Sequence, residues 1–302
     1  MKIGYYPGCS LHGMAIDFGM STAATCKALG IELVEVPDWS CCGASAAHST
    51  NHLLGMALPA RNLSLAEQAG LEVLAAPCAL CSNAMKKTHE LILSDKETAA
   101  EISRLTGREY RGGVRVLNVI QIFLEYGLEE LRKKVVSPLD GLKVACYYGC
   151  LLTRPPDLLK FDDPEQPVLM DEVCKVLGAE PVEWGFKTEC CGAGFSMSRT
   201  DLVCELSRRI LENAVNNGAE AIIVACPMCQ SNLDMRQANI NKTFGTTFDI
   251  PVVYLTELVG LAIGVKPKKL GLRKHFVDAM RLTKRIASGV KEEAAVGETL
   301  SR

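Results

Sequence analysis

Ten of the fourteen cysteines fall into two sets of five that share one order and closely similar spacing. Each set has a single cysteine, then an adjacent pair followed by glycine, then a C-x2-C pair. The first set is Cys9, Cys41, Cys42, Cys78 and Cys81, and the second is Cys150, Cys190, Cys191, Cys226 and Cys229. Thiolates in such patterns bind zinc or iron-sulfur clusters. Because both centres commonly take four cysteines, a set of five predicts something other than an ordinary zinc site or cubane cluster.

The sequence around the cysteines repeats with them. CKALG at 26–30 matches CKVLG at 174–178, and GLEVLAAPCALCSN at 70–83 matches GAEAIIVACPMCQSN at 218–232. The matching pieces follow one another in the same order, at a nearly constant separation. We therefore predict one supersecondary unit used twice.

Within each half, short apolar runs rich in β-branched residues alternate with stretches of helical period, such as 52–69. This pattern is typical of βαβ units. It predicts an α/β fold of two pseudo-symmetric repeats, each a mostly parallel sheet flanked by helices. The predicted strands are 2–6, 33–36, 72–76, 114–118, 142–147, 181–184, 221–225 and 250–254.

The cysteine-bearing loops all come directly after predicted strands. Loops at the carboxyl ends of parallel strands converge on one edge of a sheet, where ligand sites form. We expect the five thiols of each half to meet there. Gly43 and Gly192 lack a Cβ and would let the backbone N-H groups approach a cluster closely.

The segment 127–141 interrupts the alternation with charge, proline and glycine, which marks a domain boundary. We predict a first cluster-binding repeat at 1–134 and a second at 135–264. Residues 265–302 would form a basic helix over 266–291, either solvated or docked on an acidic protein partner, followed by a loose tail.

Four cysteines stand outside the two sets. Cys26 and Cys174 recur inside helices and are predicted to pack in the core. Cys146 and Cys204 have no counterpart in the other half, and core packing is again the expectation. Cys146 precedes Cys150 by four residues and could still replace a ligand.

Composition narrows the classes of protein. A formal charge of −2 gives no basic field for nucleic acid, and the longest apolar run, 250–265, is too short to span a membrane. The N-terminus has no secretory pattern, so a cytoplasmic location is expected. Fourteen cysteines in a reducing compartment favour metal or redox chemistry over a disulfide framework.

The two complete sets, over roughly residues 1–264, resemble those of the CCG-domain proteins, and most closely the B subunit of heterodisulfide reductase from methanogenic archaea. The resemblance implies that each set binds a non-cubane [4Fe-4S] cluster, which accommodates the fifth thiolate. It further implies an oxidoreductase that reduces the coenzyme M-coenzyme B heterodisulfide to two thiols between the clusters.

The sequence has no C-x2-C-x2-C-x3-C-P run, so electrons must arrive from another protein of the complex. The resemblance implies two partners, the small iron-sulfur C subunit and the flavin-containing A subunit, with a hydrogenase or formate dehydrogenase module further off. Other relatives make an electron-transfer component of a hydroxyacid dehydrogenase or fumarate reductase system the alternative. A zinc-stabilised scaffold is the third hypothesis.

A substrate with sulfonate, phosphate and carboxylate groups calls for nearby cations and proton donors. His12, His48, Lys187 and Arg199 lie close in sequence to the set cysteines and are candidates. A solvated or supporting role is an equal alternative for each. Neither histidine can be assigned as the proton donor from the sequence, although their intrinsic pKa values suit that role.

Overall fold

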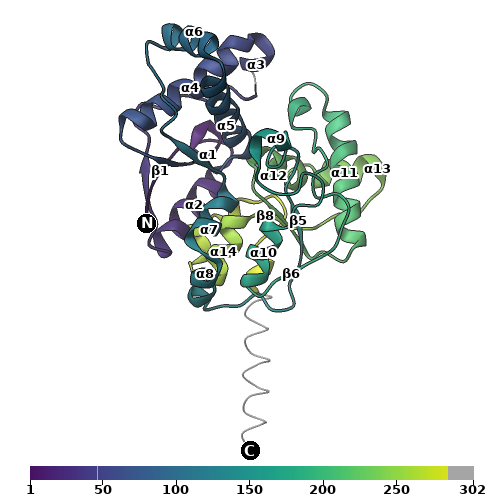
Figure 1. Ribbon diagram of the computed structural model, residues 1–302. Helices are drawn as coiled ribbons and strands as arrows, with labels where there is room; N and C mark the ends of the chain where they lie inside the picture. The colour runs from purple at the N-terminus through teal and green to yellow at the C-terminus, as the bar shows by residue number, and fades with distance from the viewer. Residues whose placement is uncertain (46, 285–302) are drawn as a thin grey trace, which may run out of the picture.

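The computed structural model describes residues 1–45 and 47–284 (Figure 1). Two four-stranded parallel sheets form, one in each half of the chain. The first has the order β2-β1-β3-β4, with β1 Lys2–Tyr5, β2 Glu32–Glu35, β3 Val73–Ala75 and β4 Arg115–Leu117. The second has the order β6-β5-β7-β8, with β5 Lys143–Tyr147, β6 Glu180–Pro181, β7 Ala221–Val224 and β8 Val252–Tyr254. The predicted α/β fold of two pseudo-repeats is confirmed.

The strands form where the sequence is apolar and β-branched. In β7 every residue is buried, as expected for a central strand of a parallel sheet covered on both faces. β6 is shorter than the predicted strand 181–184 and lies at the sheet edge. Glu180 and Val182 donate to the residue before β5 and to β5, so Pro181 between them faces the open edge, where no N-H is needed.

Helices connect the strands and cover the sheets. The first half contains α1 Gly8–Leu11, α2 Ile16–Ala28, α3 Ala47–Thr50, α4 His52–Gln68, α5 Ala79–Ser94, α6 Lys96–Thr106, α7 Val119–Tyr126 and α8 Leu128–Lys134. The second half contains α9 Pro156–Leu159, α10 Leu169–Val176, η1 Ala193–Phe195, α11 Thr200–Asn216, α12 Pro227–Asp234, α13 Gln237–Phe244 and α14 Leu255–Ala262. Helix α4 matches the predicted helix 52–69 closely. None of the helices among the described residues is long and apolar enough to cross a membrane.

The two halves exchange helix contacts reciprocally. The helix that follows the last strand of each half packs on an early helix of the other: α14 on α2, and α7 on α10 (Figure 1). At the first contact, Thr25 Oγ1 donates to the carbonyl of Thr256 at 2.8 Å. A Cβ on Gly260 would lie 2.6 Å from Thr25 Oγ1, so a larger residue here would force the Thr25 side chain, and with it this hydrogen bond, to shift. The repeats therefore share a core.

The connection between the halves is itself tied down. The N-H groups of Val136 and Ser137 both donate to the carbonyl of Ala262, at the end of α14. A division at residue 134 stays a prediction, because α7 and α14 each pack against the opposite half.

The basic C-terminal segment is not one helix. It contains α15 Pro267–Leu270 and the 3-10 helix η2 Leu272–Lys274, separated by Gly271 at a φ of +86°. A left-handed glycine ends an α-helix, so the prediction of a continuous helix from 266 is wrong over these residues. The predicted tail, and the helix beyond 284, lie outside the described residues.

Candidate metal centre

The first set of cysteines gathers at the carboxyl edge of the first sheet. Cys9 follows β1, the pair Cys41 and Cys42 follows β2, and Cys78 caps α5 directly after β3. The chain leaves β1 toward β2 and later toward β3, so the strand order reverses between β1 and β3. Such a switch point opens a crevice in parallel sheets. The expectation that the strand ends position the thiols therefore agrees with the topology.

The thiols of this set are in contact. Sγ of Cys9 lies 3.7 Å from Sγ of Cys41, and Sγ of Cys42 lies 3.2 Å from Sγ of Cys81. All of these cysteines are free thiols. Sulfur atoms bound to one tetrahedral ion lie about 3.8 Å apart, given metal-sulfur bonds of about 2.3 Å. The spacing suits shared metal ligation.

The second set repeats this arrangement. Cys150 follows β5, the pair Cys190 and Cys191 follows β6, and Cys226 caps α12 directly after β7. Sγ of Cys191 lies 3.6 Å from Sγ of Cys229, and the thiols of Cys150 and Cys190 lie close enough to shift each other's pKa.

The two sets meet. The thiols of Cys78, from the first repeat, and Cys226, from the second, lie close enough to shift each other's pKa: the interaction with Cys226 raises the pKa of Cys78, and the interactions with Cys229 and Cys78 lower that of Cys226. The pKa of each of these two thiols is also shifted by the second cysteine of its own C-x2-C pair. The two sets therefore form one continuous group of sulfur atoms across the boundary between the repeats.

Glycines bring the backbone close to the sulfurs. The N-H of Gly43 lies 3.4 Å from Sγ of Cys41, and the N-H of Gly192 lies 3.3 Å from Sγ of Cys190. Both glycines have a positive φ. A Cβ on Gly8 would lie 3.2 Å from Sγ of Cys81, and a Cβ on Gly149 would lie equally close to Sγ of Cys229. In each set, glycines with a positive φ therefore let the backbone pass close to the sulfur atoms.

Two tyrosines that sequence reasoning missed hold the Cys-Cys-Gly loops. The hydroxyl of Tyr6 donates to the carbonyl of Ser40 at 2.8 Å, and that of Tyr147 donates to the carbonyl of Glu189 at 2.6 Å. Each acceptor directly precedes an adjacent cysteine pair. The repetition of YPGC as YYGC was the signal that could have identified both tyrosines.

Hydrogen bonds within the sets separate the thiol pKa values. Bonds from Cys41 and Cys81 lower the pKa of Cys42 to about 3, and a bond from Cys150 lowers the pKa of Cys190 to about 6. The thiol of Cys81 has a raised pKa, through its hydrogen bonds to Cys42 and Cys78. The thiolate is the form that binds metal, so each set contains a sulfur ready to ligate.

The cysteines predicted to pack in the core are buried. Cys26 and Cys204 lie in α2 and α11, and Cys174 lies in α10. Cys146 is fully buried in β5, with its Sγ 3.7 Å from that of Cys174. It faces this helix cysteine from within the sheet.

The predicted cationic residues occupy different surroundings. Lys187 is 3% exposed and donates to Asp171 at 2.7 Å and to the carbonyl of Pro167 at 3.0 Å. Arg199 is exposed and pairs with Asp201. His12 is half exposed and packs edge-on against Trp39 at 5.4 Å.

A cavity of about 630 Å³ lies beside the cysteine loops. Ala44, Leu80 and Leu151, which line it, are direct neighbours of Gly43, Cys81 and Cys150 in the chain. The wall also contains His48, a predicted candidate, together with His52 and Lys87, which sequence reasoning missed. Met56, Leu91 and Leu158 make much of the remaining lining apolar.

Comparison with known proteins agrees with the duplication. The family model of the CCG cysteine-rich domain matches residues 3–86 and again 144–234. The chain is 34% identical to the 8-methylmenaquinol:fumarate reductase membrane anchor subunit of Wolinella succinogenes, over 93% of this chain and 99% of that protein. It is 31% identical to the B subunit of the ferredoxin/F420H2-dependent CoB-CoM heterodisulfide reductase of Methanosarcina acetivorans, over 94% of this chain and 97% of that protein.

A solved structure of a hypothetical protein from Helicobacter pylori has the same fold, with a TM-score of 0.73 at 11% identity. The matched region covers 92% of this chain and 52% of the Helicobacter pylori chain.

The fold and the site together define a class: an α/β protein of two interlocked repeats, each presenting five thiols at its carboxyl sheet edge. The matches extend over both repeats and include every cysteine of the two sets. The chain belongs to the CCG cysteine-rich domain family.

Proposed function

We propose that this chain is the disulfide-reducing component of a multisubunit oxidoreductase, with coenzyme M-coenzyme B heterodisulfide as its substrate. Each five-cysteine set would hold a non-cubane [4Fe-4S] cluster. The contact between Cys78 and Cys226 is the observation that carries the proposal, because it brings both sets to one place. A disulfide placed there could reach both centres at once. Relatives named as the B subunit of heterodisulfide reductase support the same proposal.

The residues present fit such clusters. Ten thiols are available, and the N-H groups of Gly43 and Gly192 donate to sulfur and would offset the negative charge of bound thiolates. When bound, the clusters would supply single electrons and iron positions that accept sulfur. The cleavage of one disulfide takes two electrons and two protons and gives two thiols.

The cavity beside the sets is the proposed approach for the substrate. Its apolar wall suits an aliphatic chain, and Lys87 suits an anionic group. His48 and His52 are the histidines that face this cavity, so we assign proton delivery to them. His12, Lys187 and Arg199 have no such position, and their roles are orientation or packing.

Electrons would come from two partner proteins, the small iron-sulfur C subunit and the flavin-containing A subunit of heterodisulfide reductase. A hydrogenase or formate dehydrogenase module would lie upstream of these. A multisubunit assembly is supported by the relatives, which are themselves named as single components of larger enzymes.

The experiment uses anaerobically purified protein and reduced benzyl viologen as the electron donor. We expect viologen oxidation that requires the heterodisulfide and releases both thiols. The Cys191→Ser variant should lose this activity, whereas Cys174→Ser, a buried cysteine outside the sets, should keep it. Intact clusters with no heterodisulfide-dependent oxidation would contradict the proposal.

A second function is favoured by one relative. The 34% identical protein is named as part of an 8-methylmenaquinol:fumarate reductase, and the apolar cavity could also hold a quinol ring. The chain would then pass electrons in a fumarate reductase or hydroxyacid dehydrogenase system and cleave no disulfide. Reduction of the clusters by a menaquinol analogue, without any response to the heterodisulfide, would favour this function.

A further inference from the structure

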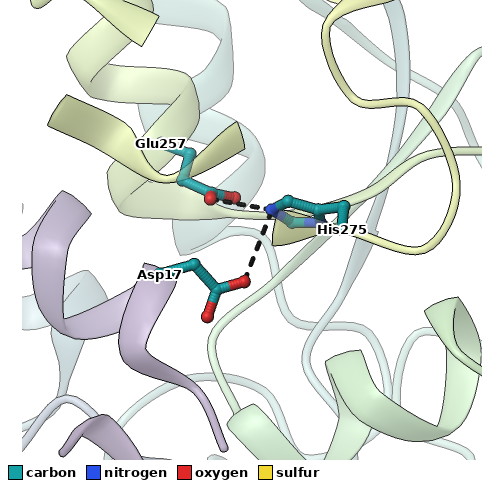
Figure 2. Close-up of side chains that lie close together, drawn as sticks. All are labelled: Asp17, Glu257 and His275. Carbon is teal, nitrogen blue, oxygen red and sulfur yellow. Dashed lines mark hydrogen bonds and ion pairs between the residues drawn. The ribbon is translucent and has the colours of Figure 1, made fainter. Parts of the chain in front are cut away.

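A buried group of ionisable side chains lies where three parts of the chain meet. Asp17 comes from α2, Glu257 from the first turn of α14, and His275 from the segment after η2 (Figure 2). The His275 and Glu257 side chains are fully buried, and that of Asp17 is 8% exposed. None of the three belongs to the cysteine sets.

The carboxylates of Asp17 and Glu257 each direct an oxygen toward the same ring nitrogen of His275, as Figure 2 shows. Nε2 of His275 lies 2.8 Å from Oε1 of Glu257 and 3.7 Å from Oδ2 of Asp17. The three atoms lie within 4.8 Å of one another. Ligand atoms of one ion with bonds near 2.1 Å are separated by about 3 to 4 Å. The 3.7 Å between His275 and Asp17 already suits a metal, and the 2.8 Å hydrogen bond between His275 and Glu257 would open slightly as the ion enters.

The second polar atom of each side chain is held from behind. Oε2 of Glu257 accepts the N-H of Tyr254 at 2.8 Å, and Oδ1 of Asp17 accepts the N-H of Phe18 at 3.0 Å. Nδ1 of His275 lies 3.2 Å from the side-chain amide of Gln230. A flip of this amide would turn its oxygen toward the ring, where it accepts Nδ1-H, and Nε2 would then bind the ion in place of its hydrogen bond to Glu257. Metal ligands are typically oriented by such outer partners.

The charge of the group calls for a cation. A third carboxylate, Asp234, lies near His275 and accepts the N-H groups of Phe276 and Val277. Three carboxyl groups therefore surround one imidazole in a buried place, where ionised carboxylates are stable only when they are paired or bind a metal. A divalent ion would suit this acidic set.

We propose that Asp17, Glu257 and His275 form a binding site for a divalent first-row ion, separate from the cysteine sets. One imidazole and two carboxylates suit Zn²⁺, Fe²⁺ or Mn²⁺. The ion fastens the segment after η2 to both repeats, because each ligand comes from a different element. Gly271 supports this closure, since a Cβ there would lie 2.8 Å from Cα of Asp17.

The test is the metal content of anaerobic protein produced in medium that contains iron, zinc and manganese. Iron that belongs to clusters is matched by acid-labile sulfide, so the readout is divalent metal in excess of sulfide. We expect about one such ion per chain in the wild type, and loss of at least about tenfold of it in Glu257→Gln and His275→Gln. The midpoint of thermal unfolding should fall in both variants.

Asp234→Asn is the matched control. It removes a buried carboxylate from the same neighbourhood, but one whose oxygens are taken by backbone N-H groups. This variant should retain the ion. A wild-type chain with complete sulfide and no excess metal would overturn the proposal, and this measurement needs no variant to fold. Equal metal loss in Asp234→Asn and Glu257→Gln would also overturn it, since it would indicate a diffuse charge effect.

Discussion

The thiols of Cys78 and Cys226 interact across the boundary between the two repeats, each shifting the pKa of the other. The two residues are equivalent: each caps a helix that begins directly after the third strand of its sheet. Because α5 and α12 both begin at this contact, their partial positive ends face the same group of sulfurs, where they favour thiolate and an anionic cluster. The duplication therefore produces one centre with two halves, which suits a substrate whose cleavage takes two electrons.

Replacing Cys42 by serine should remove the cluster of the first set. Cys42 contacts Cys81 and has the lowered pKa of a ready ligand, whereas Cys26 is buried in α2 outside the set. Cys26→Ser should therefore keep its iron and lose only about 1 to 3 kcal/mol of stability, from burial of a hydroxyl. Iron and labile sulfide per chain measure the difference, and equal losses would refute the ligand assignment.

Gly43→Ala should damage the first set more than Gly30→Ala does. Both glycines have φ above +70°, so each substitution carries the cost of about 1 to 2 kcal/mol for a left-handed residue. Only at Gly43 would the new methyl group lie 2.7 Å from Ala47 Cβ; at Gly30 nothing lies within 4 Å. We expect lower iron content for Gly43→Ala alone, and a larger loss of thermal stability than for Gly30→Ala. Indistinguishable variants would exclude a packing role for this glycine.

Lys187→Met should destabilise the fold. Removal of one partner from a buried ion pair costs about 3 to 5 kcal/mol, and Asp171 would retain the hydroxyl of Tyr148 but lose its cation. Arg199→Gln, at an exposed pair, should leave the urea midpoint unchanged. A Lys187→Met protein with normal stability and a raised KM would instead place Lys187 at the substrate.

Asn83→Leu should loosen the second repeat, although Asn83 belongs to the first. Its amide donates to the carbonyls of Leu151 and Arg154, in the loop that follows Cys150. Loss of these bonds leaves two carbonyls without this donor, at about 1 to 3 kcal/mol for each unsatisfied group. Asn217→Ala, on the surface, is the control. Hydrogen exchange in 151–154 should rise only in Asn83→Leu, and unchanged exchange would contradict the bridging role.

The strands and the cysteine loops of this protein could be predicted from its sequence, because they depend on residues that are close together in the chain. The eight predicted strands and the cysteine positions follow from β-branched runs and from loops at the strand ends, which are determined by near neighbours. Because the sequence pattern occurs in both halves, each half supports the prediction made for the other. The same logic led to Gly43 and Gly192, whose N-H groups do reach the neighbouring sulfurs.

Other features depend on which elements meet in space. The spacing of apolar residues in α14 does not indicate that this helix packs on α2. The approach of Asp17, Glu257 and His275 could therefore not be predicted. The basic segment after 265 was predicted as one helix from its spacing of charged and apolar residues. Gly271 interrupts it because the chain must turn against Asp17.

Iron and acid-labile sulfide in anaerobically purified protein test the central claim, that both cysteine sets hold clusters. Two [4Fe-4S] clusters require about eight iron atoms and eight sulfides per chain. We predict this content for the wild type and about half of it for Cys42→Ser and for Cys191→Ser. Zinc bound to the sets without labile sulfide would contradict the account.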